Sequence, residues 1–233
     1  MLAVRRLLFA AWLYLSILFA GLLFTPLLLG PRRWTNLGVG LWARTVIFGL
    51  KTIMGVRIEL RGLEHRPSGA ALIGAKHQSM LDICLPYLAM KDPCFVFKKE
   101  LMWTPFIGWY ALKAGMIPVD RAGHSAALKK MVADTLDRLK SERQVVIFPE
   151  GTRTAPGAEP QYKPGVAALY RELGVPCHPI ATNTGTVWPA HGIGFNPGVV
   201  VYEFLEPVPA GLKRGAFMAE LERKVETASL AML

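Results

Sequence analysis

The chain has 233 residues, of which 52% are hydrophobic and only 19% are charged, and its mean hydropathy is +0.31. This composition excludes an intrinsically disordered chain, which needs few apolar residues and many charges. It exceeds the apolar content of an ordinary soluble domain, so membrane segments are expected. The three cysteines are too few and too scattered for a disulfide framework, and the absence of a CxxC pair argues against a zinc site. A reducing compartment is the simplest interpretation.

The net charge of +10 is concentrated near the N-terminus. Residues 1–60 contain seven Lys or Arg residues, and Glu59 is their only acidic residue. A basic excess favours either nucleic acid or an anionic membrane surface as a partner. Here the positive charges flank long apolar runs, and no basic stripe with interleaved aromatic residues occurs elsewhere in the sequence. We therefore expect a membrane surface, and no nucleic acid, as the partner.

The first apolar stretch, Leu7 to Gly30, contains 24 uncharged residues between Arg5–Arg6 and Arg32–Arg33. As a helix it would be about 36 Å long, which is enough to cross roughly 30 Å of hydrocarbon. A cleaved signal peptide is not favoured, because no convincing small-residue cleavage site precedes Pro31. The matching arginine pairs predict no orientation, and Pro26 favours a bent helix that does not cross.

A second apolar stretch, Trp34 to Val56, is interrupted by Arg44 and Lys51. These two residues are seven apart, so on a helix they share one face, which is typical of an amphipathic helix at the membrane interface. Two architectures stay open: a single crossing, or a helical hairpin within one leaflet. We expect residues 1–55 to form membrane-anchoring helices and residues 56–233 to form an α/β domain.

Beyond residue 55 the pattern changes to short β-rich runs that alternate with helices. Several runs lack polar alternation, which indicates strands buried on both faces, as in a layered α/β sheet flanked by helices. The clearest helix is Ser125–Lys140, with Ser125 as a candidate N-cap, and Gly165–Leu173 and Gly215–Leu230 are further candidates. The predicted strands are Val56–Leu60, Ala70–Ala75, Cys94–Lys98, Met116–Val119, Val145–Phe148, Cys177–Ala181 and Val199–Phe204.

Four short motifs lie at or beside predicted strands, and the first contains a histidine and an aspartate. His77 and Asp82 are five residues apart in the run KHQSMLD, which on a regular helix would place them on different faces. If His77 lies in the loop and Asp82 in the first helical turn, the carboxylate reaches His77 Nδ1 and leaves Nε2 free as a general base. Taken alone, a loop histidine beside a first-turn aspartate explains the same residues.

The other three motifs are suited to binding an anion or framing a strand. Arg121 ends the run VDR, and Arg153 ends the run FPEGTR after a buried strand. In FPEGTR, Gly151 allows close approach of a ligand to the backbone, and arginine binds phosphate with two hydrogen bonds. Either arginine alone is equally explained as a solvated surface residue. In the fourth motif, Val175 to Ile180, two prolines frame the entry to a strand, and a rigid loop is the simpler interpretation.

Together and in this order, the four motifs resemble those of the glycerolipid acyltransferase family, particularly its bacterial 1-acylglycerol-3-phosphate acyltransferases of the PlsC type. The resemblance covers residues 70–190, and its most specific part is FPEGTR about seventy residues after HxxxxD. The run KKEL at residues 98–101 and the run NTG at residues 183–185 also look like bacterial members. Lys76 departs from the family pattern, because many relatives have Asn before the histidine.

The resemblance implies transfer of a fatty acyl group from acyl-CoA or acyl-carrier protein to the sn-2 hydroxyl of lysophosphatidic acid, giving phosphatidic acid in phospholipid biosynthesis. It implies direct attack without an acyl-enzyme, with His77 as the general base and Asp82 as its orienting partner. The two N-terminal stretches look like the family's membrane-binding helices. The implied substrate-binding residues are Lys98, Arg121, Glu150, Gly151, Thr152 and Arg153, and the implied acyl-channel border is Val175, Pro176, Pro179 and Ile180.

The sequence contains no metal-binding cluster and no nucleotide-binding loop, so no metal and no cofactor beyond the thioester co-substrate are expected. The lipid acceptor resides in a leaflet and the donor is cytosolic. The expected location is therefore the inner (plasma) membrane, with the catalytic domain on its cytoplasmic face. Lyso-ornithine lipid, another lysophospholipid and glycerol-3-phosphate are alternative acceptors, but two arginines suit the phosphomonoester of lysophosphatidic acid.

Two interpretations lie outside this family. A thioesterase or serine hydrolase would use Ser79 or Ser125 as the nucleophile, but the G-x-S-x-G elbow is absent, because the run GHSAA lacks the second glycine. A membrane-anchored lipid-binding or scaffold protein needs no catalytic group. It does not explain why a histidine, an aspartate and two arginines all fall at strand ends, where α/β proteins place their sites.

Overall fold

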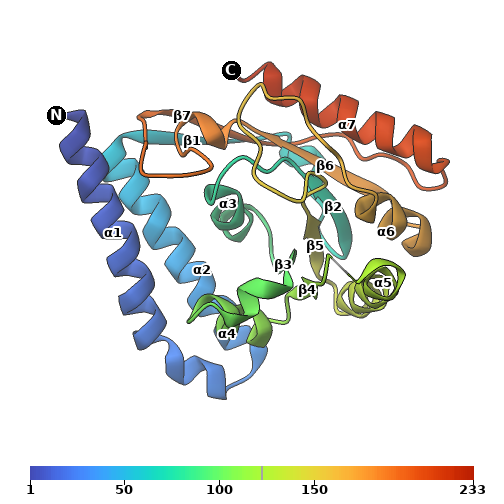
Figure 1. Ribbon diagram of the computed structural model, residues 1–233, viewed down its shortest axis with the longest axis horizontal. Coiled ribbons are helices and arrows are strands. Elements are labelled where there is room, and N and C mark those ends of the chain that lie inside the picture. The colour runs from blue at the N-terminus through green and yellow to red at the C-terminus, as the bar shows by residue number, and fades with distance from the viewer. Residues whose placement is uncertain (122) are drawn as a thin grey trace.

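The computed structural model describes residues 1–121 and 123–233. Its centre is a seven-stranded sheet surrounded by helices (Figure 1). Every predicted strand is present, and each differs from its predicted bounds by at most one residue at either end. The strands are β1 (Val56–Arg61), β2 (Ala71–Ala75), β3 (Pro93–Lys98), β4 (Ile117–Val119), β5 (Gln144–Ile147), β6 (Cys177–Thr182) and β7 (Gly198–Phe204).

The strand order is β1-β7-β6-β2-β5-β3-β4. Strands β6 and β7 are antiparallel, and the other neighbouring strands are parallel. In the register of the sheet, Ile73 of β2 lies opposite Val146 of β5 and His178 of β6. The carboxyl ends of β2, β3, β4, β5 and β6 therefore meet at one edge, where α/β proteins bind their ligands.

The middle of the sheet explains why its strands lack polar alternation. All five residues of β2 and all four of β5 are buried, and Leu72, Ile73, Val145 and Val146 are each 0% exposed. A strand covered on both faces has no solvent side to carry polar residues. The prediction of a sheet with helices on both sides is confirmed.

Sequence periodicity predicted three of the helices to within one residue and missed a short one. Helix α6 has the predicted bounds and α7 begins one residue earlier than predicted, whereas the short α4 was not predicted. The prediction of Ser125 as an N-cap is wrong: α5 begins at His124, its N-cap is Gly123, and among the described residues no side chain caps it. The helices are α1 (Leu2–Leu23), α2 (Arg32–Gly49), α3 (Leu81–Ala89), α4 (Ile107–Lys113), α5 (His124–Lys140), α6 (Gly165–Leu173) and α7 (Arg214–Leu230).

Helices α1 and α2 lie side by side at one end of the molecule, away from α5, α6 and α7 (Figure 1). Residues 7–30 are not one straight helix: α1 ends at Leu23, and a 3-10 turn at Thr25–Leu29, which contains Pro26, leads into α2. A π-helical turn, Leu50–Met54, and Gly55 in the left-handed region then lead into β1. By length and composition alone, Leu2–Leu23 and Arg32–Met54 are each able to cross a membrane.

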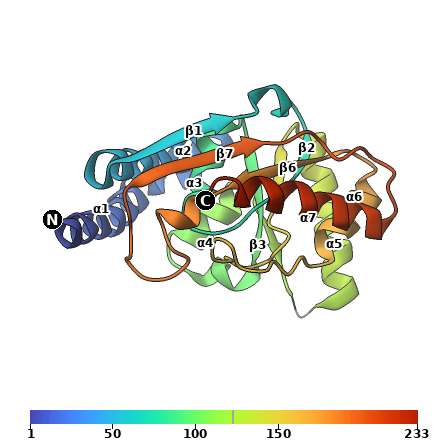
Figure 2. The same cartoon turned by 90° about the horizontal axis from the view of Figure 1, so that it is seen from above.

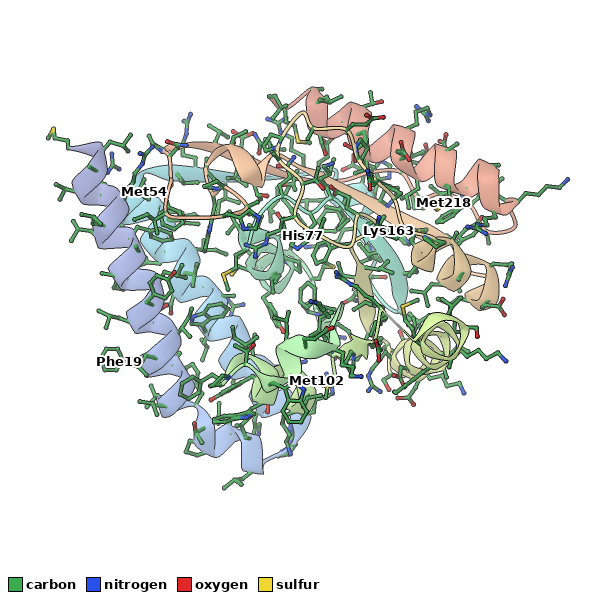
Figure 3. The ribbon with its side chains drawn as sticks, in the orientation of Figure 1. Phe19, Met54, His77, Met102, Lys163 and Met218 are labelled. Atoms are coloured by element: carbon green, nitrogen blue, oxygen red, sulfur yellow. The ribbon has the colours of Figure 1, made fainter. Side chains whose placement is uncertain are left out.

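Helix α1 has a packed side and an exposed side. Phe9 is 0% exposed, and its ring centroid lies 5.6 Å from that of Trp188 and 4.7 Å from that of Phe195. Phe19, on the outer side of the helix, is 63% exposed (Figure 3). The start of α2 is fixed to the sheet domain, because Arg32 donates to both carboxylate oxygens of Asp92, at 3.0 and 2.8 Å.

Candidate active site

The loop after β2 brings His77 and Asp82 together at the carboxyl edge of the sheet. His77 lies in the loop and Asp82 in the first turn of α3, which is the condition under which the contact was expected, and Asp82 Oδ2 is 2.9 Å from His77 Nδ1. The same oxygen accepts hydrogen bonds from the backbone amides of Gln78, at 2.6 Å, and Ser79, at 2.8 Å. The loop therefore folds around the carboxylate, which fixes the direction of the imidazole ring.

The other oxygen of Asp82 is held from a different part of the chain. Thr184, in the turn after β6, donates its hydroxyl to Asp82 Oδ1, and the Asp82 side chain is 1% exposed. Nearby, the amide of Gly185 donates to Gln78 Oε1 at 3.0 Å. The run NTG, noted in the sequence only as a family-like pattern, thus has a structural role in orienting the histidine's partner.

The His77 ring is fixed from its face as well as from Nδ1. It stacks on Phe148, which follows β5, with ring centroids 4.0 Å apart and planes 16° from parallel. The backbone N–H of His77 donates to Glu150 Oε1 at 2.9 Å, and its carbonyl accepts from the amide of Thr154 at 2.8 Å. The HxxxxD and FPEGTR runs are therefore joined by direct contacts, although about seventy residues separate them.

A cavity of about 1130 Å³ opens beside this loop and extends between α4 and the α1–α2 pair. This volume slightly exceeds the usual range of roughly 300–1,000 Å³ for small-molecule pockets. Its walls are mainly aliphatic and aromatic, as a lipid chain requires. Apolar lining residues include Ile17, Phe24, Val39, Trp42, Tyr87, Phe95 and Tyr110, and polar lining residues include His77, Lys98, Asp120, Arg121, Glu150, Thr152 and Lys163.

The predicted substrate-binding residues are mostly gathered at this cavity. Lys98, at the end of β3, and Arg121, after β4, line it, and both side chains are exposed to solvent. Glu150, Gly151 and Thr152 line it from the loop after β5. Arg153 is exposed and is not among the lining residues, although it directly follows Thr152.

Gly151 is distinguished by its backbone conformation and Glu150 by its buried carboxyl group. Gly151 has φ +68°, a left-handed conformation that favours glycine. Burial raises the pKa of the Glu150 carboxyl above its ordinary value, while hydrogen bonds from Thr154 and the His77 amide and the charge of Lys76 act in the opposite direction. Its position beside His77 makes it part of the same site.

The residues predicted to border an acyl channel lie elsewhere. Val175 and Pro176 precede β6, and Pro179 and Ile180 are buried within it. None of these four lines the cavity. Ile180 instead accepts a hydrogen bond from the amide of Lys76 at 2.9 Å, so this segment supports the sheet beneath the reactive loop.

Three residues of the site were not singled out by sequence reasoning. Lys163 lines the cavity from the segment before α6, and its amide donates to Pro149 at 2.7 Å (Figure 3). Thr184 holds Asp82. Glu226 of α7 forms a partly buried ion pair with Lys76. The sequence signals were a lysine before a helix start, the family-like run NTG around Thr184 and, for Lys76, a departure from the family pattern.

The serine-hydrolase alternative finds no support in the geometry. Ser79 is 0% exposed, and its hydroxyl accepts the amide hydrogen of Leu81 at 3.0 Å. Ser125 lines the cavity from the first turn of α5. Within the described part of the chain, neither serine hydroxyl forms a hydrogen bond with a histidine ring, and His77 is paired with Asp82 instead. Among residues 1–121 and 123–233, no group of three or more His, Cys, Asp or Glu side chains is arranged to hold a metal ion.

Fold and site together define an α/β protein that presents a histidine–carboxylate pair to an apolar cavity of lipid size. Comparison with known proteins agrees with this class. The Acyltransferase family model matches residues 57–183, more than half of the sequence. The chain belongs to the acyltransferase family, as its motifs predicted.

Several relatives carry the same name. The chain is 33% identical over 185 residues to the 1-acyl-sn-glycerol-3-phosphate acyltransferase of Pseudomonas aeruginosa, covering 79% of this chain and 72% of the relative. It is 30% identical over 171 residues to the Saccharomyces cerevisiae enzyme of that name, covering 71% and 56%. It is 32% identical over 145 residues to the alpha form of Homo sapiens, covering 60% and 50%. The chain thus spans only about half the length of these eukaryotic relatives.

A solved structure shares the fold over the whole chain. The crystal structure of the 1-acyl-sn-glycerophosphate (LPA) acyltransferase PlsC from Thermotoga maritima matches with a TM-score of 0.79. The match covers 100% of this chain and 98% of the other, at 23% sequence identity. It includes the two N-terminal helices, so the arrangement of α1 and α2 against the sheet is shared with that protein.

Proposed function

We propose that this protein transfers a fatty acyl group from an acyl thioester, either acyl-CoA or acyl-carrier protein, to the sn-2 hydroxyl of lysophosphatidic acid, giving phosphatidic acid. The observation that carries the proposal is the contact of 2.9 Å between His77 Nδ1 and Asp82 Oδ2 beside an apolar cavity of about 1130 Å³. The Pseudomonas and yeast relatives are both named 1-acyl-sn-glycerol-3-phosphate acyltransferase, which supports the acceptor.

In the proposed mechanism, His77 Nε2 accepts the proton of the acceptor hydroxyl as its oxygen attacks the thioester carbonyl carbon. The resulting tetrahedral oxyanion collapses, the carbon–sulfur bond breaks and the imidazolium returns the proton to the thiolate. The products are an ester and a free thiol, so atoms and protons balance without an acyl-enzyme. A positioned general base of this kind contributes about 10²- to 10⁴-fold in rate. Asp82, held by three other donors, keeps Nδ1 protonated and Nε2 available.

The phosphate of the acceptor would be bound by cations at the cavity. Lys98, Arg121 and Lys163 line it and carry exposed side chains. Arginine suits a phosphomonoester because its planar fork forms two parallel hydrogen bonds with phosphate oxygens. Arg153 follows the lining residue Thr152 and is retained as a further phosphate ligand. Glu150 and Gly151 would shape the position of the glycerol backbone.

The proposed reaction takes place at the cytoplasmic face of the inner (plasma) membrane. Moving an acyl chain fully into water costs about 0.8 kcal/mol per CH₂, so an enzyme seated on the leaflet that holds its acceptor avoids this cost. The exposed apolar side chains of α1, such as Leu15, Phe19 and Leu22, support this placement. The thioester itself supplies the activated acyl group, so the proposed chemistry uses no metal and no further cofactor.

The test is an acyl-transfer assay with the purified protein. Labelled lysophosphatidic acid in mixed detergent micelles is supplied with acyl-CoA or acyl-carrier protein, and phosphatidic acid is measured. We expect product from the wild type, and a loss of at least about 10²-fold in kcat for His77→Ala. His191→Ala is the matched control, because His191 is exposed and lies outside the cavity lining, and it should keep full activity.

Parallel assays with glycerol-3-phosphate, lyso-ornithine lipid and another lysophospholipid test the acceptor. Preference for one of these over lysophosphatidic acid would contradict the acceptor assignment while retaining acyl transfer. Absence of phosphatidic acid with both donors, or a fully active His77→Ala variant, would contradict the proposed reaction.

A further inference from the structure

Three charged side chains meet beneath the reactive loop. Lys76 Nζ lies 2.9 and 2.8 Å from the two carboxylate oxygens of Glu226 in α7, and 3.3 Å from Glu150 Oε2. The side chains of Lys76 and Glu150 are 2% and 1% exposed, and that of Glu226 is 16% exposed. Burying a lysine this completely requires anions that compensate for its lost hydration, and here two carboxylates share one ammonium group.

The position of Lys76 follows from the alternation of side chains along β2. A Cβ atom added to Gly74 would lie 3.1 Å from a methyl carbon of Leu221 in α7, so Gly74 faces that helix. Lys76 comes two residues later, so its side chain points to the same side of the sheet as α7. The side chain of His77, one residue further, points to the opposite side. Helix α7 lies along β6, which is next to β2 (Figure 2), and its Glu226 accepts hydrogen bonds from Lys76. The charged cluster and the cavity are therefore on opposite sides of the strand end.

Glu150 links the two sides. Its Oε1 atom accepts the backbone N–H of His77 at 2.9 Å, and its Oε2 atom faces Lys76. The charged and titratable groups around it are Lys76, Glu226 and Tyr162, whose hydroxyl donates to Glu226 Oε1 at 3.0 Å. Lys76 is the one cation among these groups, and its charge opposes the effect of burial on the Glu150 pKa. The carboxylate that bonds the His77 backbone is thus paired with the lysine that Glu226 of α7 holds, and the hydrogen bond from Thr154 acts on its pKa in the same direction as that lysine.

We propose that the Lys76–Glu226 ion pair is a positioning device for catalysis: α7 holds Lys76, Lys76 holds Glu150, and Glu150 fixes the backbone amide of His77. The catalytic consequence rests on the proposed function. The family model matches residues 57–183, and Glu226 lies outside that region. The last helix therefore adds a contact to the site that the matched region does not contain. Neither Lys76 nor Glu226 lines the cavity, and both act through Glu150.

Two substitutions test this chain of contacts. Lys76→Met leaves Glu150 and Glu226 without their shared cation, and Glu226→Gln removes the charge of the α7 partner with little change in shape. We expect each variant to lower kcat about 10- to 100-fold while KM for lysophosphatidic acid stays within about twofold, because a displaced catalytic group costs rate more than ground-state binding. The double variant should be no slower than Lys76→Met alone, since the two residues act as a unit.

Lys224→Met is the matched control. Lys224 also belongs to α7 and also forms an ion pair, with Glu206 at 3.0 Å, and its side chain is 15% exposed. Within the part of the chain that the structure describes, Lys224 contacts Glu206 and Glu220, and it forms no hydrogen bond or ion pair with Lys76, Glu150 or the reactive loop. The control therefore removes an ion pair of the same helix without touching the proposed chain of contacts, and kcat should stay within about twofold of the wild type.

Hydrogen exchange supplies a second measurement that needs no activity. In the wild type the His77 amide is bonded to Glu150 and should exchange slowly. We expect exchange in the peptide covering residues 76–82 to accelerate at least about 10-fold in Lys76→Met and Glu226→Gln and to stay unchanged in Lys224→Met. If Lys76→Met does not fold, the nearly isosteric Glu226→Gln variant carries the comparison.

The outcomes separate this inference from the proposed function. Unchanged exchange and unchanged kcat in Glu226→Gln would overturn the positioning role. Equal losses in Lys224→Met would also overturn it, because general docking of α7 would then be responsible. A wild-type protein that does not acylate lysophosphatidic acid contradicts the proposed function only, since the exchange comparison still decides whether the ion pair positions His77.

Discussion

The Asp82 carboxylate is surrounded by donors from two distant segments. His77 Nδ1 and the amides of Gln78 and Ser79 approach Oδ2 from the loop after β2, and the Thr184 hydroxyl approaches Oδ1 from the turn after β6. An ionised carboxylate only accepts hydrogen bonds, so each of these contacts favours one orientation. The imidazole direction is thus determined by a carboxylate that is itself fixed from two sides.

Asp82→Asn should separate the role of Asp82 in orienting the His77 ring from the space that its side chain fills. An amide group is nearly the same size, but its NH₂ end donates and conflicts with the donors already present. We expect kcat to fall about 10²- to 10⁴-fold, as for loss of an oriented general base, with a smaller change in KM for the acceptor. Steady-state kinetics of the single variant and of Asp82→Asn/His77→Ala test this. A double variant much slower than His77→Ala would show that Asp82 acts independently of the histidine.

Lys163 is the cation of the cavity that sequence reasoning missed, and its role is separable from the chemical step. Its side chain is exposed at the cavity lining, and a charge-assisted contact to phosphate contributes mainly to binding. We expect Lys163→Met to raise KM for lysophosphatidic acid about 10-fold while kcat changes less. Lys140→Met, at the exposed end of α5, is the control. A loss confined to kcat would argue against a phosphate contact.

At the residue scale, the local partners were predictable and the distant ones were not. His77 and Asp82 are five residues apart, so a loop and one helical turn suffice to predict their contact. Thr184 and Glu226 reach the site from 102 and 150 residues away along the chain. The run NTG marked Thr184 only as family-like, and no local pattern marked Glu226, because the contacts of both depend on strand order and on the docking of α7.

At the element scale, buried strands were the most predictable feature of the fold. Runs such as residues 71–75 and 144–147 are apolar throughout because both of their faces are covered. Helix α4 was missed because it has only seven residues, two turns that leave little periodicity to detect. It also begins after Phe106, which has φ +61°, an unusual backbone conformation for a residue other than glycine.

The three cysteines lie in different elements of the fold, and burial affects the thiol pKa of each. Cys84 lies in α3, Cys94 in β3 and Cys177 in β6, and all are buried. Loss of hydration raises the pKa of Cys84 and Cys177 to about 12 and that of Cys94 to about 11. Because burial disfavours the charged thiolate, these groups stay protonated until the pH approaches those values.

We therefore expect no rapid thiol reaction in the native protein at pH 8, where the thiolate fraction is on the order of 1 in 1,000 or less. Ellman's reagent should react with all three cysteines after denaturation in guanidinium chloride, and with none on the same timescale before it. A native thiol that reacts as fast as a free cysteine would show that its element opens readily.

At the scale of the whole molecule, the α1–α2 pair packs against the rest of the protein on one side and exposes apolar side chains on the other. The arginines flanking the first apolar stretch were expected to face a membrane surface. In the structure Arg5 donates to the Ile53 carbonyl, Arg6 to the Phe195 carbonyl and Arg32 to Asp92. Three of the four flanking arginines thus fasten the helices to the protein, and the exposed apolar side chains of α1 form the face that we expect to contact a bilayer.

Substitutions on the two sides of α1 should therefore separate folding from membrane binding. Phe9→Ala empties a fully buried site between two aromatic rings and should lower the free energy of unfolding by about 3–5 kcal/mol. Leu15→Ser/Phe19→Ser changes side chains that are 51% and 63% exposed. This double variant should leave thermal stability nearly unchanged but weaken binding to anionic lipid vesicles at least about 10-fold. Vesicle sedimentation and thermal unfolding measure the two effects, and equal vesicle binding by the double variant and the wild type would show that the outer face of α1 does not contact the bilayer.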